Sequence, residues 1–372
     1  TINKPGAYEG YTLAVSTDEQ IVRLINMNGK TVHSWQMDYH TVWEQVESPV
    51  GEPVREDLIY IRCVYLIANG DLCVQLSAGG QTPWGYGLVK LDKDSRVLWA
   101  DLRHFHHAVD VGDDGRVYTL EHIINPAGHE LAGFMKGRAT IDDYIVVFDQ
   151  NGKQLQRVSI FNAFADSEFK AVIWSHLRGS AGRDAGDLFH TNDVEVLSPA
   201  LAPLFPMAEA GDVMISMREI NMLAIIDMKE GKVRWIANGV WTRQHDPDFL
   251  PNGNILLFDN TYPRRGFDGL LYRSRLLEFN PQTMAVAWLY EGSTEHPLAS
   301  FIRSEVQKLA NGNVLVTESD RGRIFEVNRA GELMWEYQNP SRRMIDDKEY
   351  VPVMNSARRF SLDELSFEFN GQ

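Results

Sequence analysis

Apolar and polar residues alternate along most of the chain, and turns rich in Gly, Asn and Asp interrupt the alternation at short intervals. One unit recurs six times: an alternating strand, a turn, and a second strand that ends in Trp in five of the six copies. The copies span residues 21–35, 87–99, 144–158, 222–235, 275–288 and 323–335. Alternation around such turns predicts a β-hairpin in each copy.

A second hairpin pattern precedes most of these copies. It spans residues 67–76, 111–120, 210–217, 250–258 and 309–317. Two hairpins form a four-stranded sheet, and six such sheets in series predict an all-β fold, a six-bladed β-propeller that forms one domain over residues 1–372. An up-and-down barrel or two stacked sandwiches is the alternative all-β arrangement.

The two ends of the chain predict how the ring closes. The first repeat lacks its innermost strand, because residues 11–15 start directly at the second one. Residues 353–362 are a spare strand, and we expect them to complete the first blade and remove its open edge. Residues 122–142 and 259–271 are rich in turn residues and predict loops, whereas apolar spacing within 160–189 predicts a short helix.

Histidines recur at one position of the repeat. The first strand of each propeller blade faces the central channel, so the starts of these strands converge. Eight residues before the Gly of the inner turn stand His107, His245, Ser304 and Arg62. The fourth blade carries an insertion, and its equivalent strand starts at His190. Three neighbouring blades thus place histidine at one structural position, which favours a functional site over three separate structural histidines.

Polar neighbours narrow the chemistry of this position. Asn192 shares a strand face with His190, and Arg218 follows the next inner strand near the same end of the sheet. Three imidazoles can bind zinc or copper, or supply a nucleophile and proton-transfer groups. Arg and Asn suit an anion with several oxygens. The residues alone leave these options open.

Aspartate also recurs, three places after each histidine. The three aspartates are Asp110, Asp193 and Asp248. Because the aspartate is present in every copy, we expect it to serve the hydrogen bonding of the blade rather than the chemistry of the site.

Charge and cysteine content exclude several classes of function. The chain has 36 Lys and Arg against 51 Asp and Glu, a formal net charge of −15, which argues against nucleic-acid or anionic-membrane binding driven by bulk electrostatics. It contains no apolar run of about 18 residues, so no membrane span is predicted. Cys63 and Cys73 fall on opposite faces if Asn69-Gly70 is a hairpin turn, and we interpret them as free thiols.

Several separated motifs resemble those of the bacterial arylsulfate sulfotransferases. They are His106-His107 before a strand, His190-Thr191-Asn192, Ser216-Met217-Arg218, and Gln244-His245-Asp246 leading into residues 251–260. Residues 10–35 and the segment that starts at Ser274 are similar to the same family, and the likeness covers most of the chain. The resemblance implies a six-bladed propeller that moves a sulfuryl group between phenols without a nucleotide sulfate donor.

The resemblance also implies a role for each residue. His245 is the nucleophile that is transiently sulfurylated in a ping-pong reaction. The sulfuryl oxygens are held by His107, His190, Asn192 and Arg218. We expect Arg62, Asn260 and Ser304 to contact the substrate as well.

The same resemblance sets expectations for partners and location. The partners are small aryl sulfates and phenols, with no cofactor and no metal. Because the chain starts at Thr1 rather than Met, we expect an N-terminal piece to be missing, and a periplasmic or secreted location fits this start.

Two features depart from the family pattern. After Asp259-Asn260 the chain reads TYPRRG, where a glycine is expected directly after the asparagine, and this departure bears on substrate choice. The 372 residues are too few for the extra N-terminal β domain through which some members dimerise, so the family gives no argument for a dimer here.

Two other classes of function use the same predicted features. Another propeller enzyme would keep the polar centre but act as a polysaccharide lyase with His as base, or as a metal- or quinone-dependent oxidoreductase. A binding or scaffold propeller without chemistry is the third option. The convergence of polar residues on the axis counts against that option.

Overall fold

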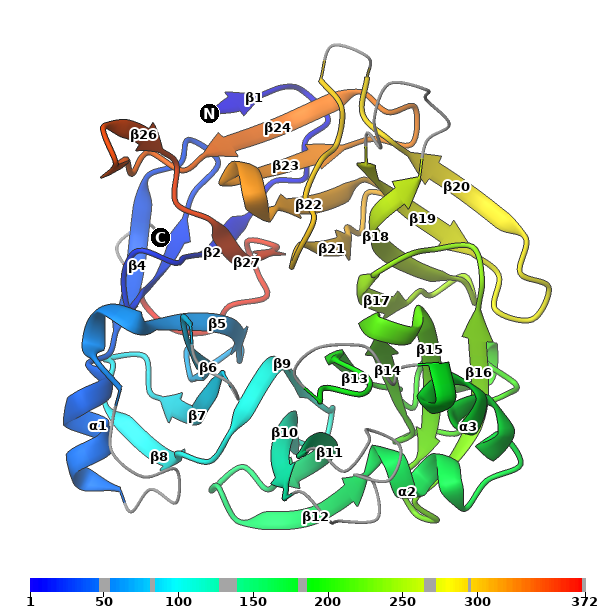
Figure 1. The fold of residues 1–372 in the computed structure, drawn as a ribbon. Helices are drawn as coiled ribbons and strands as arrows, with labels where there is room; N and C mark the ends of the chain where they lie inside the picture. The colour runs from blue at the N-terminus through cyan, green and yellow to red at the C-terminus, as the bar shows by residue number, and fades with distance from the viewer. Residues whose placement is uncertain are drawn as a thin grey trace.

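The computed structural model describes residues 1–46, 54–80, 84–126, 139–179, 186–263, 272–293 and 296–369, and the statements below concern these residues. Six sheets are arranged in a ring around a central axis (Figure 1). This arrangement confirms the predicted six-bladed β-propeller.

Each of the first three blades has four strands. From the axis outward, blade 1 contains β27 (Met354–Phe360), β2 (Tyr11–Ser16), β3 (Ile21–Ile25) and β4 (Thr31–Gln36). Blade 2 contains β5 (Ile59–Leu66), β6 (Leu72–Ala78), β7 (Gly85–Leu91) and β8 (Val97–Asp101). Blade 3 contains β9 (Phe105–Val111), β10 (Val117–Asn125), β11 (Thr140–Phe148) and β12 (Gln154–Ser159).

The other three blades follow the same order. Blade 4 contains β13 (Thr191–Val196), β14 (Val213–Met217), β15 (Met222–Asp227) and β16 (Lys232–Asn238). Blade 5 contains β17 (His245–Phe249), β18 (Ile255–Pro263), β19 (Tyr272–Phe279) and β20 (Val286–Tyr290). Blade 6 contains β21 (Glu305–Lys308), β22 (Val314–Glu318), β23 (Arg323–Val327) and β24 (Leu333–Gln338).

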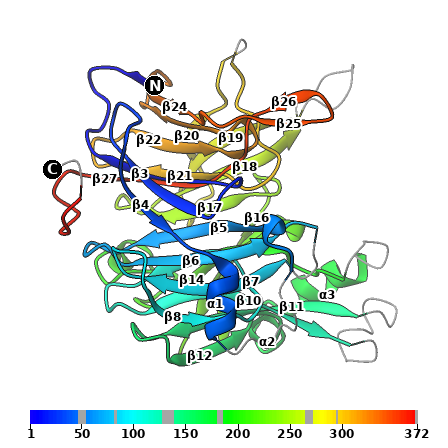
Figure 2. The same ribbon diagram turned by 90° about the vertical axis from the view of Figure 1, so that its left-hand side faces the viewer.

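Both ends of the chain help to close the ring, beside blades 6 and 1 (Figures 1 and 2). The C-terminal strand β27 pairs antiparallel with β2, with Leu13 opposite Arg358, as predicted. The N-terminal strand β1 (Ile2–Asn3) was not predicted. It adds to the outer edge of blade 6, where Asn3 lies opposite Trp335. The chain therefore covers one strand edge at each end.

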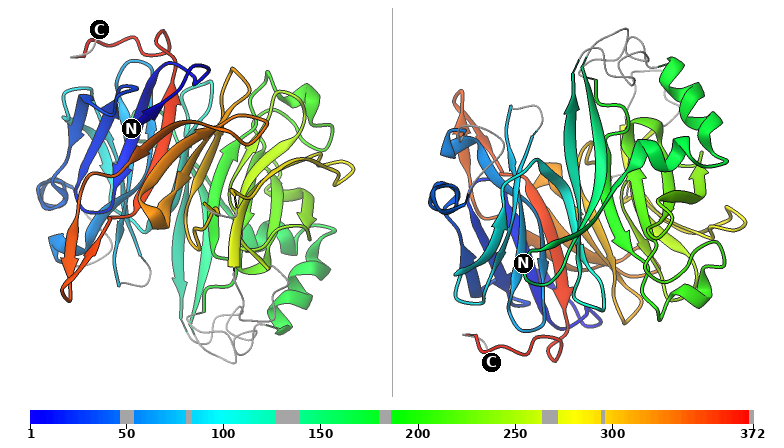
Figure 3. Two further views of the ribbon diagram at one scale, coloured as in Figure 1. Left: turned by 90° about the horizontal axis from the view of Figure 1, so that it is seen from above. Right: turned by 90° about the horizontal axis from the view of Figure 1, so that it is seen from below.

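The helical segments are short and lie outside the sheets (Figure 3). They are α1 (Tyr39–Gln45), α2 (Ile160–Ala165), α3 (Lys170–Gly179) and the 3₁₀ turns η1 (Glu56–Leu58), η3 (Ala202–Leu204), η4 (Arg218–Ile220) and η5 (Ser319–Arg321). A small hairpin joins β25 (Arg343–Ile345) to β26 (Lys348–Tyr350). The short helix expected within 160–189 is two helices, and Ser159 caps the first by accepting a hydrogen bond from the Asn162 N–H.

Two segments that were predicted as loops begin or end as β-strands in the structure. Residues 122–125 continue β10 and residues 140–142 belong to β11, so strand pairing extends into the segment 122–142. Residues 259–263 likewise continue β18. The remaining parts of these segments, 127–138 and 264–271, lie outside the described residues.

The recurring tryptophans join neighbouring blades. Four of them donate an indole hydrogen bond to a turn carbonyl of the next blade: Trp35 to Gly70, Trp99 to Gln150, Trp288 to Arg329 and Trp335 to Met27, at 2.8–3.1 Å. A separate cluster of buried apolar side chains fills each of the six interfaces between adjacent blades. The repeated Trp therefore ties one blade to the next through both packing and a hydrogen bond.

The structure also bears on two smaller predictions. Cys63 and Cys73 are unpaired, and they are out of register because Cys73 lies opposite Tyr65. Among the described residues, no helix is long and apolar enough to cross a bilayer.

Candidate active site

The starts of three inner strands bring the predicted histidines together. His107 lies in β9, His245 begins β17 and His190 directly precedes β13. All three side chains line one pocket of about 220 Å³, together with Arg62 and Arg218. The wall is completed by Tyr60, Trp84, Ile302 and Arg303. Five of the predicted site residues therefore meet in a single cavity.

The other three predicted residues lie around this pocket. Asn192 and Ser304 line a larger cavity of about 1,050 Å³ that is bounded by the six innermost strands. Arg62, His107 and His245 line both cavities, so the small pocket adjoins one end of the large one. Asn260 is fully buried and contacts His245 from behind, rather than lining either cavity.

Backbone strain marks the same positions. His107 and His190 have φ values of 62° and 49°, and Arg303 and Ser304 have values of 59° and 79°. Non-glycine residues rarely adopt this left-handed region, and where they do, the strain is commonly associated with functional sites. The chain holds these side chains at the strand starts despite an energetic cost.

The hydrogen bonds of His245 determine its tautomer. Both N–H bonds of the Asn260 amide donate to backbone carbonyls, of Ser300 at 3.0 Å and of Arg303 at 2.9 Å. The Asn260 Oδ1 atom therefore faces His245 and accepts a hydrogen bond from its Nδ1 atom at 2.7 Å. With the proton on Nδ1, the Nε2 atom carries the lone pair. The Arg303 backbone N–H lies 3.2 Å from that Nε2 atom.

The His190 side chain contacts the carboxylate of Asp187. Its Nδ1 atom lies 2.6 Å from Asp187 Oδ2, and its backbone N–H donates to Asp187 Oδ1 at 2.9 Å. Burial alone would raise the pKa of Asp187, but the His190 charge and hydrogen bonds hold that pKa below its ordinary value. The Asp187 carboxylate orients the imidazole through Nδ1, so His190 is suited to exchange a proton through Nε2.

The positive side of the pocket comes from arginine side chains. The Arg218 Nη1 atom forms an ion pair with Glu219 at 3.2 Å, whereas its buried Nε atom has no hydrogen-bond partner among the described residues. The Asn192 side chain donates to the Gln244 carbonyl at 2.9 Å, and its amide carries a second N–H. Uncommitted donors of this kind fit the oxygens of an anion.

Burial keeps two of the pocket histidines, His245 and His107, neutral. It lowers the pKa of His245 to about 3, and the Arg62 charge lowers it further than the Asn260 hydrogen bond raises it. Burial also holds the pKa of His107 well below its ordinary value, with the charge of His190 acting in the same direction. The Nε2 atom of His245 is therefore unprotonated at neutral pH.

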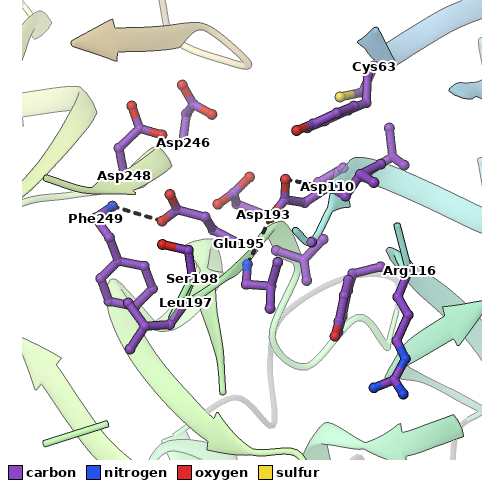
Figure 4. A pocket seen from close by; sticks show the side chains of 18 of the residues that line it. Cys63, Asp110, Arg116, Asp193, Glu195, Leu197, Ser198, Asp246, Asp248 and Phe249 are labelled. Carbon is purple, nitrogen blue, oxygen red and sulfur yellow. Dashed lines mark hydrogen bonds between the residues drawn. The ribbon is translucent and has the colours of Figure 1, made fainter. Parts of the chain in front are cut away.

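Carboxylates line the rest of the large cavity (Figure 4). Several of them accept a hydrogen bond from a backbone N–H of the next blade: Asp110 from Val196, Glu195 from Phe249, Asp246 from Val306 and Glu305 from Ala357. For Asp110 this confirms the expected role in blade hydrogen bonding, and the bond crosses to the neighbouring blade. Asp193 and Asp248 face the same cavity, and their role stays a prediction.

Several site residues were not predicted from the sequence. Asp187 and Arg303 contact the pocket histidines from loops between blades, where the repeat offers no reference position, and Trp84 contacts them from the connection between β6 and β7 of blade 2. His106 was named only as part of a motif, and its Nδ1 atom lies 2.8 Å from that of His107. His122 lies on the second strand of blade 3, in a segment that was predicted as a loop.

Fold and site together define a propeller with a buried, histidine-lined and arginine-lined pocket at one end of its central cavity. Such a pocket is suited to a small anion and to nucleophilic or acid–base chemistry. The chain belongs to the arylsulfotransferase (ASST) family, whose family model matches residues 64–340. Membership supports aryl sulfotransferase activity in general and places the protein among transferases.

Solved structures share the fold with little sequence identity. A protein of unknown function from Bacteroides caccae superposes with a TM-score of 0.55 at 12% identity, covering 88% of this chain and 93% of that one. The WD40 propeller domain of Doa1 has a TM-score of 0.47 at 11% identity, covering 96% and 92%. A streptogramin B lyase has a TM-score of 0.47 at 10% identity, covering 97% and 95%. No curated protein matches the chain.

Proposed function

We propose that the protein transfers a sulfuryl group from an aryl sulfate to a phenol through a covalent intermediate on His245. The observation that carries this proposal is the tautomer of His245: Asn260 accepts a hydrogen bond from Nδ1–H, so that Nε2 is unprotonated inside a pocket with three arginines. The family assignment favours this transferase reaction over the lyase, oxidoreductase and scaffold alternatives.

The first half-reaction forms one bond and breaks another. The Nε2 lone pair of His245 attacks sulfur, an S–N bond forms, and the S–O bond to the aryl group breaks. The aryl oxygen leaves with the bonding electron pair and takes a proton from the Nε2 atom of His190, whose positive charge Asp187 balances. Arg218, Asn192 and His107 hold the sulfuryl oxygens, where charge accumulates in the transition state.

The second half-reaction reverses these steps with another phenol. The incoming phenol gives its proton to His190 Nε2, and its oxygen attacks sulfur. The S–N bond breaks, and the neutral imidazole of His245 is restored. Aryl sulfate plus phenol thus becomes phenol plus aryl sulfate, and two half-reactions through one intermediate predict ping-pong kinetics.

Intact mass spectrometry after mixing with 4-nitrophenyl sulfate tests both the chemistry and the nucleophile. We expect the mass to increase by one sulfuryl group, the adduct to disappear on addition of phenol, and His245→Ala to form no adduct. His296→Ala is the matched control, because His296 is exposed and lies outside both cavities. Absence of nitrophenolate release by the wild type would reject the proposed function, and transfer by His245→Ala would reject the nucleophile alone.

A further inference from the structure

A second group of histidines lies directly behind the pocket, in blade 3. His106 and His107 are adjacent on β9, and His122 lies on the neighbouring strand β10. Their exposed fractions are 0%, 8% and 1%. One ring nitrogen of each lies within 4.8 Å of one ring nitrogen of both others. Of the three, only His107 lines the small pocket.

Two of these rings have polar atoms without a partner. The Nε2 atoms of His106 and His122 are both buried and make no hydrogen bond among the described residues. An unsatisfied buried polar atom is destabilising, so these two atoms require compensating interactions. A bound ion that accepts a lone pair would supply one to His122 Nε2, whereas His106 Nε2 lies on the side of Asp143, 3.6 Å from its Oδ1 atom.

Asp143 orients the cluster as a carboxylate does behind metal-binding histidines. Its Oδ1 atom accepts a hydrogen bond from His122 Nδ1 at 2.8 Å and lies 3.6 Å from His106 Nε2. Its Oδ2 atom accepts from the Thr191 N–H at 2.9 Å. A histidine that donates one ring N–H to a carboxylate presents its other nitrogen as a metal ligand, which for His122 is the unpartnered Nε2 atom.

The contact between His106 and His107 points to the same ligand. Their Nδ1 atoms face one another at 2.8 Å, so in the absence of an ion one of the two must carry a proton. In a tetrahedral zinc site the ligand nitrogens lie about 3.3 Å apart, given Zn–N distances of about 2.0–2.1 Å. The rings of His106 and His122 are stacked with centroids 3.4 Å apart, so one ring must tilt for both to point at a shared ion.

We propose that His106, His107 and His122 bind one divalent transition-metal ion, with zinc as the expected occupant and Asp143 as the carboxylate that orients the ligands. Three neutral imidazoles suit zinc, copper, nickel and cobalt, and do not suit calcium or magnesium. Bound through Nδ1, His107 keeps Nε2 for the sulfuryl pocket. This site lies outside the proposed transfer reaction, because no bond made or broken there involves the ion.

Metal analysis of the whole protein tests the site. The chain is stripped with a chelator, dialysed separately against Zn²⁺ and Co²⁺, and analysed by mass spectrometry for metal content. We expect about one ion per chain for each metal, and a visible absorption band of four-coordinate Co²⁺. His122→Asn and His106→Asn should each lose the ion, whereas the exposed His296→Ala should retain it.

The outcomes separate this inference from the proposed function. His245→Ala should bind the metal as the wild type does while failing to transfer sulfuryl groups. Binding of neither metal by the wild type, checked by circular dichroism to be folded, would overturn the site even if transfer occurs. Metal uptake by both His122→Asn and His106→Asn at the wild-type level would overturn the assignment of ligands.

Discussion

The two ends of the central cavity are built from the same six inner strands but carry opposite chemistry. At one end, His107, His190 and His245 meet arginine side chains in the small pocket. One to five residues further along the same strands, Asp110, Glu195 and Asp246 face the cavity. At the histidine end the Arg218 Nε atom has no partner among the described residues, whereas each of these three carboxylates is bound to the backbone of the neighbouring blade.

This difference shows that one inner strand can both position a residue of the candidate site and join its blade to the neighbouring blade. The strand starts are strained and leave polar atoms free, as expected of a site that binds a ligand. The carboxylates on the same strands join blade to blade. Arg62, Arg218 and Arg303 supply positive charge at the histidine end, which favours an anion there. A net charge of −15 therefore does not prevent an anion from binding in the small pocket.

Removing a donor at the histidine end is expected to have the largest effect. Arg218→Ala should lower kcat for sulfuryl transfer by about 10²–10³-fold, because the loss of one donor to transition-state oxygens costs about 2.7–4 kcal/mol. Arg116→Ala is the matched control, since Arg116 is an exposed arginine on the wall of the large cavity. Steady-state kinetics with 4-nitrophenyl sulfate and phenol make the comparison. Equal losses in the two variants would contradict the assigned difference between the two ends.

Replacing Asp187, the carboxylate beside His190, is expected to lower kcat by a smaller factor that depends on the substrate. Asp187→Asn removes the carboxylate 2.6 Å from His190 Nδ1 and weakens proton donation to the leaving oxygen. The loss in kcat should reach about 10²-fold with unsubstituted phenyl sulfate and be much smaller with 4-nitrophenyl sulfate, whose leaving group needs little protonation. Rates for a series of aryl sulfates measure this dependence. A loss in kcat that is the same for every leaving group would mean that Asp187 has only a structural role.

A change at the carboxylate end should alter stability rather than transfer. Burial raises the pKa of Asp248 to about 7, with the nearby charge of Asp110 acting in the same direction. A carboxyl group with a raised folded-state pKa favours the folded state fully at a pH below about 4, and this contribution is lost as the pH rises through about 7. Asp248→Asn should therefore raise the free energy of unfolding by on the order of 1 kcal/mol at pH 8, and change it little at pH 4.

Urea unfolding of the wild type and Asp248→Asn at both pH values measures this effect. The matched control is Asp114→Asn, whose carboxylate is exposed at the rim of the same cavity. Destabilisation of Asp248→Asn at pH 8 would show that its charge is compensated in the folded state.

The sequence predicted the parts of the site that follow the repeat. His107 and His245 could be aligned because glycines with positive φ, Gly115 and Gly253, fix the inner turns of their blades, and His190 was placed from the start of the equivalent strand. Asp187 and Arg303 could not be found this way, because they lie in loops whose length differs between blades. His122 was missed because strand pairing in blade 3 continues beyond the turn-rich residues that predicted a loop. Asn260 was expected to contact substrate, but it orients His245 from behind.

The smallest expected effect is that of pH on the first half-reaction. An ordinary histidine nucleophile would be protonated, and so inactive, below a pH of about 6.5. The pKa of His245 is about 3, mainly because the ring is buried. With a leaving group that needs no proton, the rate of the nitrophenolate burst should therefore change by less than about 2-fold between pH 5 and pH 8. Rapid-mixing kinetics at several pH values, with absorbance read at the isosbestic point of nitrophenol, measure this rate. A decrease in the burst rate centred near pH 6.5 as the pH falls would mean that the His245 ring is exposed to water, in contrast to its burial in the structure.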